Sequence, residues 1–414
     1  MSEWIPVTLG ESCDILDNQR VPINSIGRAE IEGEIPYYGA NGVQGYVNDF
    51  IFNEPLILIA EDGGYFDEYQ TRPIAYRIHG KSWVNNHAHV LRAKPKYNQD
   101  FIFYSLQHKN ITPFIKGGTR AKLNQAELKQ VEFLCPEFQN EQAAIANVLE
   151  AVHVAIEKTE ALIAKYQQIK AGLMHDLFTR GVTADGKLRP PREQVPELYH
   201  ETPIGWIPKE WKVAGLDQAC QHIVDCPHST PNFVPSGVLV ARTMHIKDGI
   251  FLEDIASRVS ETEYRERVAR LMPMAGDVIF TREAPVGEAF VIPHEMRICL
   301  GQRVMLIRPK ASVLDGDYLV AQIYSGSLSL RISELTAGTT NPHLNVADVR
   351  NLAIAVPSFS EQTSMTKRIK AINAHIQQQR ESLEKLRQQK LGLMHDLLTG
   401  KVRVKFADSQ KELA

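Results

Sequence analysis

The sequence lacks the features that mark membrane and secreted proteins. No apolar run approaches the roughly 20 residues that span a bilayer, although 43% of the 414 residues are hydrophobic. The first residues, Met1 to Trp4, do not show the charged-then-apolar pattern of a signal peptide. The five cysteines are an odd number without a paired framework, which fits free thiols in a reducing compartment. We therefore expect a cytoplasmic protein with no membrane partner.

Sequence motifs of catalysis are also missing. There is no GxxxxGK[ST] loop for nucleotide phosphates and no GxGxxG after a strand. The nearest match to the Asn-Pro-Pro-aromatic tetrad of amino-methyltransferases is Asn341-Pro342-His343-Leu344, which lacks the second proline and the aromatic. The sequence also shows no carboxylate–lysine cluster of the kind that nucleases use. We expect a binding protein with no catalytic residues and no cofactor of its own.

A zinc site is not expected either. Cys220, His222, Cys226 and His228 lie within nine residues, but their spacing is not that of a standard zinc finger. A closed tetrahedral site normally draws its ligands from two separated pairs. We predict that the chain has no metal ligands.

The chain has no excess of basic charge. It carries 46 Lys and Arg against 49 Asp and Glu, a net charge of −3, whereas nucleic-acid-binding proteins are usually basic. Overall charge is a weak exclusion, because basic residues can gather on one face and partner subunits can share phosphate contacts.

An internal duplication organises the chain. Residues 141–182 and 361–402 align without a gap, 220 residues apart, and both contain the hexapeptide GLMHDL. Upstream matches extend the repeat, and the paired positions are Glu3-Trp4, Leu9, Cys13, Gly118-Thr119, Leu123-Asn124 and Pro136 with Glu210-Trp211, Leu216, Cys220, Gly338-Thr339, Leu344-Asn345 and Pro357. The globular segments otherwise differ almost completely. This pattern indicates one scaffold that presents two different binding surfaces.

The repeat and the proline-rich stretch that starts at Arg189 predict six segments. The predicted segments are a first recognition domain (1–137), a first long helix (138–180), a proline-rich linker (181–205), a second recognition domain (206–357), a second long helix (358–400) and a C-terminal tail (401–414).

The two long helices carry matching seven-residue apolar repeats. Their 4-3 spacing is typical of a coiled-coil seam, formed by Ile145, Leu149, Val152, Ile156, Ile163, Tyr166, Leu173 and Leu177 and by Met365, Ile369, Ile372, Ile376, Leu383, Leu386, Leu393 and Leu397. Polar residues interrupt both seams at the same places, Thr159 with Gln379 and Lys170 with Lys390. We predict that the helices pair antiparallel within the chain, with Thr159 and Gln379 near the middle to fix register. About 37 helical residues give a rod of about 55 Å. The alternative is that they dimerise two copies.

The ends of the helices contain stop and start signals. Ser358 with Glu361 predicts a capping box, and Gly181 and Gly400 occupy the position of a C′ glycine. Gly172 and Gly392 inside the helices suggest close approach of another backbone or subunit. Adjacent His-Asp pairs at 175–176 and 395–396 point in different directions and cannot form a proton relay. Coiled-coil or subunit-docking roles are predicted for Gly172, Leu173, His175, Gly392, Leu393 and His395.

Both globular segments alternate short β-type runs with turns. Leu56–Ile59 and Val278–Phe280 predict strands, and Tyr318–Ile332 predicts an amphipathic helix. The fold class that we expect is α+β, with two α/β recognition domains joined by two long antiparallel coiled-coil helices in pseudo-twofold symmetry.

Polar loop residues are the candidates for contacts with DNA. Arg suits guanine, Asn and Gln suit adenine, and hydroxyls reach phosphates or base edges. The candidates in the first segment are Gln19, Arg20, Asn41, Gln44, Asn86, His87, Thr119, Arg120 and Lys122. Those in the second are His228, Thr230, Arg242, Thr243, Arg282, Arg303, Thr340, Asn341 and His343. The alternative for each loop is a solvated polar turn.

These motifs together resemble the specificity subunits of type I restriction–modification systems. The helix ends GLMHDLFTRGV and GLMHDLLTGKV resemble the repeated spacer regions of that family. Residues 35–42 with 59–63 resemble one common type of target-recognition domain, and residues 225–231 with 276–282 resemble another. The resemblance covers nearly the whole chain.

The resemblance implies a function in recognition of double-stranded DNA. Each recognition domain would bind one half of a bipartite target, and the helices would set the length of the unread spacer. Two modification subunits would carry out S-adenosylmethionine-dependent adenine methylation, and restriction subunits would add ATP- and Mg-dependent translocation and cleavage, so these cofactors belong to the partners. The competing hypotheses are a two-headed protein-binding adaptor and a self-sufficient methyltransferase or nuclease.

Overall fold

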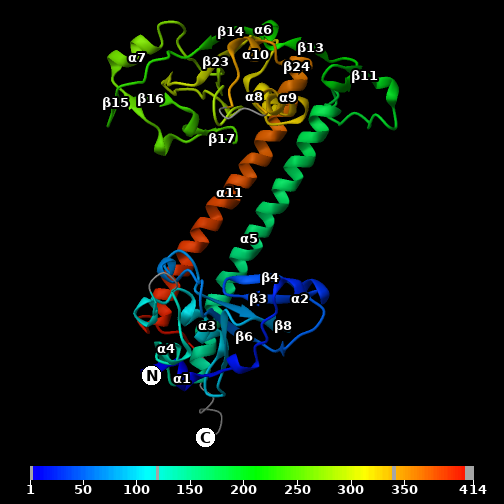
Figure 1. The fold of residues 1–414 in the computed structure, drawn as a ribbon. Coiled ribbons are helices and arrows are strands. Elements are labelled where there is room, and N and C mark those ends of the chain that lie inside the picture. The colour runs from blue at the N-terminus through cyan, green and yellow to red at the C-terminus, as the bar shows by residue number, and fades with distance from the viewer. Residues whose placement is uncertain (1–2, 118–120, 338–341, 406–414) are drawn as a thin grey trace. The chain divides into compact units, whose positions relative to one another are not determined.

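The computed structural model describes residues 3–117, 121–337 and 342–405. The chain divides into two compact units. Unit 1 comprises Met1–Ala161 with Arg380–Ala414, and unit 2 comprises Leu162–Gln379. The two long helices, α5 (Gln139–Thr179) and α11 (Phe359–Leu398), each contribute residues to both units (Figure 1).

Unit 1 is built around two four-stranded sheets. The first is antiparallel, in the order β2 (Cys13–Ile15), β9 (Ala88–Ala93), β6 (Leu56–Ala60) and β7 (Ala75–Ile78). The second has the order β4 (Gly42–Val47), β3 (Ile35–Gly39), β8 (Lys81–Val84) and β5 (Phe52–Asn53), with β3 and β8 parallel. The remaining pair of strands is β1 (Trp4–Thr8) with β10 (Glu132–Pro136). The helices are α1 (Leu9–Ser12), α2 (Ser25–Glu30), α3 (Gln99–Gln107) and α4 (Gln125–Leu128), with 3₁₀ turns at Asp17–Gln19, Phe66–Glu68 and Thr112–Phe114.

Unit 2 repeats the first sheet of this plan and varies the second. Its antiparallel sheet has the order β14 (Cys220–Asp225), β23 (Val304–Pro309), β20 (Val278–Thr281) and β21 (Ala289–Val291). Its second sheet has the order β15 (Phe233–Val234), β19 (Arg258–Val259), β16 (Val238–Ala241) and β22 (Ile298–Leu300), with β16 and β22 parallel. The strands β13 (Lys212–Gly215) and β24 (Ala353–Val356) correspond to β1 and β10.

The short helices of unit 2 correspond only in part to those of unit 1. They are α6 (Leu216–Ala219), α7 (Glu261–Arg267), α8 (Gly316–Ile323), α9 (Gly326–Thr336) and α10 (Val346–Arg350), with 3₁₀ turns at Pro196–Leu198, Thr243–His245 and Glu253–Ile255. Two small hairpins complete the unit, β11 (Tyr199–Thr202) with β12 (Gly205–Pro208) and β17 (Ile246–Lys247) with β18 (Ile250–Phe251).

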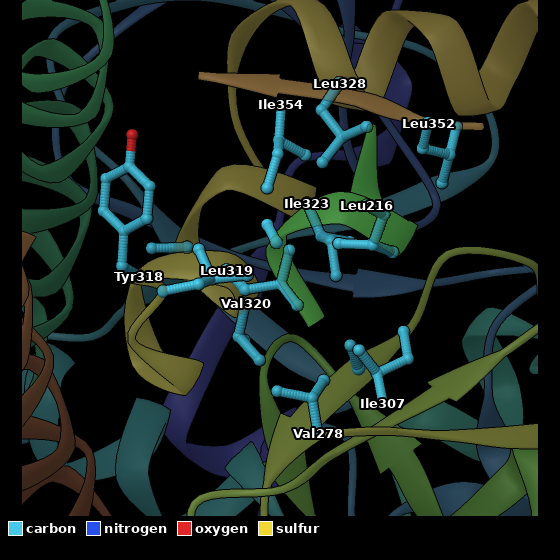
Figure 2. Packing of buried hydrophobic residues seen from close by; sticks show 14 of the residues in the cluster. Leu216, Val278, Ile307, Tyr318, Leu319, Val320, Ile323, Leu328, Leu352 and Ile354 are labelled. Carbon is cyan, nitrogen blue, oxygen red and sulfur yellow. The ribbon is translucent and has the colours of Figure 1, made fainter. Parts of the chain in front are cut away.

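The cores lie where the antiparallel sheets meet short helices. All five residues of β6 and all four of β20 are buried, which confirms the two predicted strands. Figure 2 shows Leu319 and Ile323 of α8 packed towards Leu216, with Val278 and Ile307 of the sheet below them. The prediction of one helix over Tyr318–Ile332 is wrong. The chain forms α8 and α9 instead, because the backbone turns at Gly326, whose φ of 59° favours glycine.

The long helices pair antiparallel within each unit, as the seam predicted. In unit 1, Arg387 forms an ion pair with Glu160 at 2.7 Å, and Lys390 lies 3.4 Å from His153. In unit 2, the rings of Tyr166 and His375 stack at 5.9 Å. The predicted seam residues are all buried or half-buried, so apolar burial holds the pair together.

The helix ends confirm some predictions and correct others. Gly181 and Gly400 have φ of 66° and 71°, as C′ glycines require. The amide of Glu361 donates to Ser358 Oγ at 3.3 Å, but the Glu361 carboxylate binds elsewhere, so the capping box is only half formed. The hydroxyl of Thr159 donates to the Ala155 carbonyl of its own helix, and its predicted function in register stays a prediction.

The segment predicted as a linker has structure of its own. Val182 forms a β-bridge with Leu188, and the hairpin β11–β12 spans the predicted boundary at residue 205. All five cysteines are buried and free. Burial raises the pKa of the Cys220 thiol to about 12. Within the described residues no helix is long and apolar enough to cross a membrane.

Candidate nucleic-acid interface

An internal network of charges fixes the loops of unit 1 that carry several candidate residues. The guanidinium of Arg20 donates to Glu61 at 2.8 Å and to the Ala88 carbonyl at 2.7 Å. His89 is 1% exposed, and its Nδ1 and Nε2 lie 2.6 Å from Asp17 Oδ2 and 2.8 Å from the Leu123 carbonyl. Arg20 is therefore engaged inside the chain, where it holds the loop around Gln19 against the segment before Ala88.

The carboxylates of this network stay ionised at neutral pH. Burial raises the pKa of Asp17, but the hydrogen bond and charge of His89 lower it further, and the net shift is downward. The pKa of Glu61 is lowered in the same way, since hydrogen bonds from Lys122 and Arg20 outweigh its burial. Lys122, a candidate for contact with DNA, reaches Glu61 at 2.9 Å with its side chain still 46% exposed.

Asp17, Glu61 and His89 also form the one cluster of described residues whose ligand atoms lie close enough together to suit a metal ion. Arg20 and Lys122 already neutralise Glu61, and both nitrogens of His89 face acceptors. The arrangement is explained by ion pairs and hydrogen bonds within the chain, so it calls for no bound cation.

A cavity of about 470 Å³ at the edge of β3, β4 and β8 is lined by residues 22–25, Arg28 and Tyr37 and by four further polar residues. They are Gln44, Asn85, Asn86 and His87, of which Gln44 and Asn86 are exposed and Asn85 is buried. The side chain of His87 is held by Asp62 at 2.7 Å. Three of these four residues were candidates from the sequence, and the structure brings them together around one opening.

The other candidates of unit 1 lie in exposed turns. Gln19 ends a 3₁₀ turn, and Asn41 donates to the Gly63 carbonyl at 2.9 Å, which joins two glycine-containing loops. Thr119 and Arg120 lie outside the described residues.

Unit 2 fixes its candidate loops with a corresponding pair. Arg282, which follows β20, donates to Asp225 at the end of β14 at 3.0 Å, and Asp225 also lies 3.5 Å from His228. Glu283 contacts both Arg282 at 3.4 Å and Arg303 at 3.2 Å. Arg282 is largely enclosed, whereas Arg303 is exposed, so Arg303 is the better placed of the two for DNA.

Arg242 and Thr243 follow strand β16 of the second sheet of unit 2, and a cavity of about 630 Å³ lies at the same sheet. The Arg242 guanidinium lies 5.1 Å from the centre of the Phe233 ring, which lines this cavity. The hydroxyl-bearing Thr230 is exposed. His343 forms a β-bridge with Glu283, whereas Thr340 and Asn341 lie outside the described residues.

Four of the six predicted docking residues are exposed on the long helices. Gly172 and Gly392 are exposed, and at neither position does a described residue lie within 4 Å of where a Cβ would be. The prediction of close backbone approach is therefore wrong within this chain, and approach by a partner subunit stays a prediction. His175 and His395 are exposed, whereas Leu173 and Leu393 are half-buried in the seam.

The attachment of each long helix to the preceding globular part depends on a residue that was not predicted from the sequence. Gln142 and Gln362 are fully buried and occupy equivalent positions. Gln142 accepts from the Asn98 amide at 2.7 Å, and Gln362 accepts from the Asp315 amide at 2.8 Å. The only signal was the repeated Glu-Gln dipeptide, which alone does not reveal what it contacts.

Two related α+β units, each with its own stretch of the antiparallel helices α5 and α11, define a duplicated protein. The family model for the type I restriction modification DNA specificity domain matches residues 1–168 and 256–388. The chain belongs to this family.

Individual relatives agree with this assignment. The chain is 25% identical over 423 residues to the type I restriction enzyme MjaVIII specificity subunit of Methanocaldococcus jannaschii, covering 97% of this chain and 94% of that one. It is 39% identical over 150 residues to a putative type I restriction enzyme specificity subunit of Haemophilus influenzae, covering only 36% and 37%. The crystal structure of a type I restriction–modification S subunit from M. genitalium has the same fold, with a TM-score of 0.63 at 15% identity over 98% of this chain and 97% of that one.

Proposed function

We propose that this chain is the DNA-recognition subunit of a type I restriction–modification enzyme. Unit 1 and unit 2 each bind one half of a bipartite target in double-stranded DNA. The long helices set the number of base pairs that are left unread. The observation that carries the proposal is the duplication itself: the two units share an antiparallel sheet with the same strand order and the same helix attachment, yet their exposed loops carry different polar side chains.

The charge distribution of the loops supports this function. In both units, arginines near the candidate loops are tied to acidic residues of the same unit, Arg20 to Glu61 and Arg282 to Asp225. Such pairs hold loop backbones rigid, and rigid loops are needed when polar side chains discriminate base edges. Exposed Gln44, Asn86 and Arg303 then provide the base contacts.

Partner subunits supply the chemistry. Two modification subunits dock on the helices, at the open surfaces around Gly172 and Gly392, where exposed Ile169 and Leu391 offer apolar area. S-adenosylmethionine binds to these subunits, and ATP and Mg to the restriction subunits. Their share of phosphate contacts compensates for the acidic net charge of this chain.

The test is a genome-wide map of methylated adenines in the host with this gene intact and deleted. The expected result is the loss of one two-part motif with a fixed, unread spacer. If the methylated sites stay the same while the partner subunits are expressed, the proposal is wrong, and the protein-binding adaptor becomes the leading hypothesis. Purified complex should also bind target DNA with an affinity that falls steeply with salt.

A further inference from the structure

The side chain of Gln44 is directed by a defect in its strand. β3 and β4 pair antiparallel, with Tyr37 opposite Gly45 and Tyr38 opposite Val43. Gln44 is therefore the extra residue of a β-bulge, a feature that redirects a side chain out of the regular alternation. The redirected amide lies across Gly39, where a Cβ would overlap with Gln44 Nε2. Only glycine at position 39 leaves room for this arrangement.

Asn85 determines which end of the Gln44 amide is turned away from Asn85. The backbone amide of His87 donates to Asn85 Oδ1 at 2.8 Å, and a backbone amide can only donate. The other end of the Asn85 side chain is therefore its donor, Nδ2, which lies 3.1 Å from Gln44 Oε1. Gln44 must present its oxygen to Asn85, so its own donor group, Nε2, is at the opposite end.

Asn85 itself is held firmly. It is 3% exposed, and its backbone amide donates to the Tyr38 carbonyl at 3.0 Å, which continues the parallel pairing of β3 and β8. A buried asparagine with fixed partners thus orients an exposed glutamine at the rim of a cavity of about 470 Å³. On the same rim, the guanidinium of Arg28 lies 4.8 Å from the centre of the Tyr37 ring.

We propose that Gln44 reads one base pair of the half-site of unit 1, and that Asn85 is the positioning residue that selects which hydrogen-bonding edge Gln44 accepts. This inference rests on the proposed function. Since Nε2 faces away from Asn85, Gln44 recognises a base-edge acceptor, such as a purine N7 or guanine O6. The arrangement therefore fixes both the position of the contact and the polarity of the group that is recognised.

The decisive variant is Asn85→Asp, which keeps the shape of the side chain but replaces its donor by an acceptor. One oxygen of the new carboxylate still accepts from the His87 amide, and the other now favours the Nε2 end of Gln44. The Gln44 amide turns over, and the end turned away from Asn85 becomes an acceptor. Gln44→Glu also replaces the donor by an acceptor. One oxygen of the new carboxylate accepts from Asn85 Nδ2, and the other oxygen takes the place of Nε2.

The measurement is a methylation map on a random-sequence DNA library, made with the full chain in complex with its modification subunits. Both Asn85→Asp and Gln44→Glu are expected to change the preferred base at the same single position, towards a base-edge donor such as adenine N6 or cytosine N4. Gln44→Ala should lose about tenfold in discrimination at that position only. The half-site of unit 2 and the spacer length should not change.

The matched control is Asn53→Asp, at an exposed position on strand β5 of the same sheet, which adds the same charge away from Gln44. It should leave the preferred base at every position unaltered. Unchanged motifs in all Gln44 and Asn85 variants, with methylation intact, overturn this inference but not the proposed function. A wild-type complex without any bipartite motif overturns both. If Asn85→Asp lowers the melting temperature and abolishes methylation, Gln44→Ala and Gln44→Glu, at an exposed position, still test whether Gln44 reads a base.

Discussion

The places where the two long helices begin differ in a way that their sequences conceal. In unit 1, Glu141 accepts from Arg403 at 3.1 Å and from Trp4 Nε1 at 3.4 Å, and the Arg403 side chain is 39% exposed. In unit 2, the equivalent Glu361 accepts from Arg189 at 2.5 Å and from the Val182 amide at 2.8 Å. There the Arg189 side chain is only 6% exposed.

The difference shows that the duplication preserved the glutamate that accepts these bonds, but not the arginine that donates to it. The tryptophan and glutamate recur at matching positions, but the arginines come from different places, three residues after Gly400 and eight after Gly181. Because Arg189 and the Val182 amide take up the Glu361 carboxylate, Trp211 Nε1 is a buried donor with no partner in the described part of the chain. Unit 2 has therefore exchanged one hydrogen bond for a buried ion pair.

The largest expected effect comes from removing the two glutamates. Glu361→Ala leaves Arg189 enclosed with only the exposed Glu210 as counter-charge, and should cost about 3 kcal/mol or more in the free energy of unfolding. Glu141→Ala should cost about 1–2 kcal/mol, because Arg403 can turn to water while Trp4 loses one hydrogen bond. Denaturant unfolding, with hydrogen exchange to assign each unit, measures both.

A control separates the buried pair from charge in general. Glu210→Ala removes a carboxylate that also contacts Arg189 but is 75% exposed, and it should change stability by less than about 1 kcal/mol. Equal losses for Glu361→Ala and Glu141→Ala would show that the burial of Arg189 has no energetic consequence.

The candidate loops of unit 1 should lose their protection from hydrogen exchange in acid before the rest of the molecule does. The pKa values of Asp17 and Glu61 are lowered in the folded state. Their contribution to stability is therefore complete above the unfolded pKa of about 4 and is lost as pH falls through the folded pKa. Hydrogen exchange should show that residues 17–20 and 86–90 become less protected below about pH 4.

Two variants test the assignment of this acid sensitivity. Asp17→Asn and Glu61→Gln remove the titrating groups, so loops in these variants should be less protected at pH 7 and should change less on acidification. Acid sensitivity that is undiminished in both variants would assign the effect to other carboxylates.

Much of the fold was predictable because it depends on local pattern and on the repeat. The heptad spacing from Ile145 to Leu177 predicted the antiparallel pair, and Gly181 and Gly400 predicted helix ends. The site was less accessible, since its organisation depends on contacts across long sequence separations. Arg20 was expected to be free for DNA, but Glu61, 41 residues away, engages it. Asn85 acts on Gln44 across the same separation, and no local pattern encodes that contact.

The smallest expected effect concerns the lysines that interrupt the two seams. Lys390 is 8% exposed, beside His153 and 5.6 Å from the centre of the Tyr104 ring, whereas the equivalent Lys170 is only half-buried. Burial and the nearby Arg77 lower the pKa of Lys390, so the charged form of its ammonium is destabilised in the folded protein.

Lys390→Met keeps the volume and removes the charge, and should leave stability unchanged or raise it by about 1 kcal/mol. Lys170→Met, the matched control, should have a smaller effect, because Lys170 is only half-buried. A lower melting temperature for Lys390→Met would mean that the contacts of Lys390 with His153 and Tyr104 outweigh the cost of its desolvation. Lys390 would then stabilise the helix pair of unit 1.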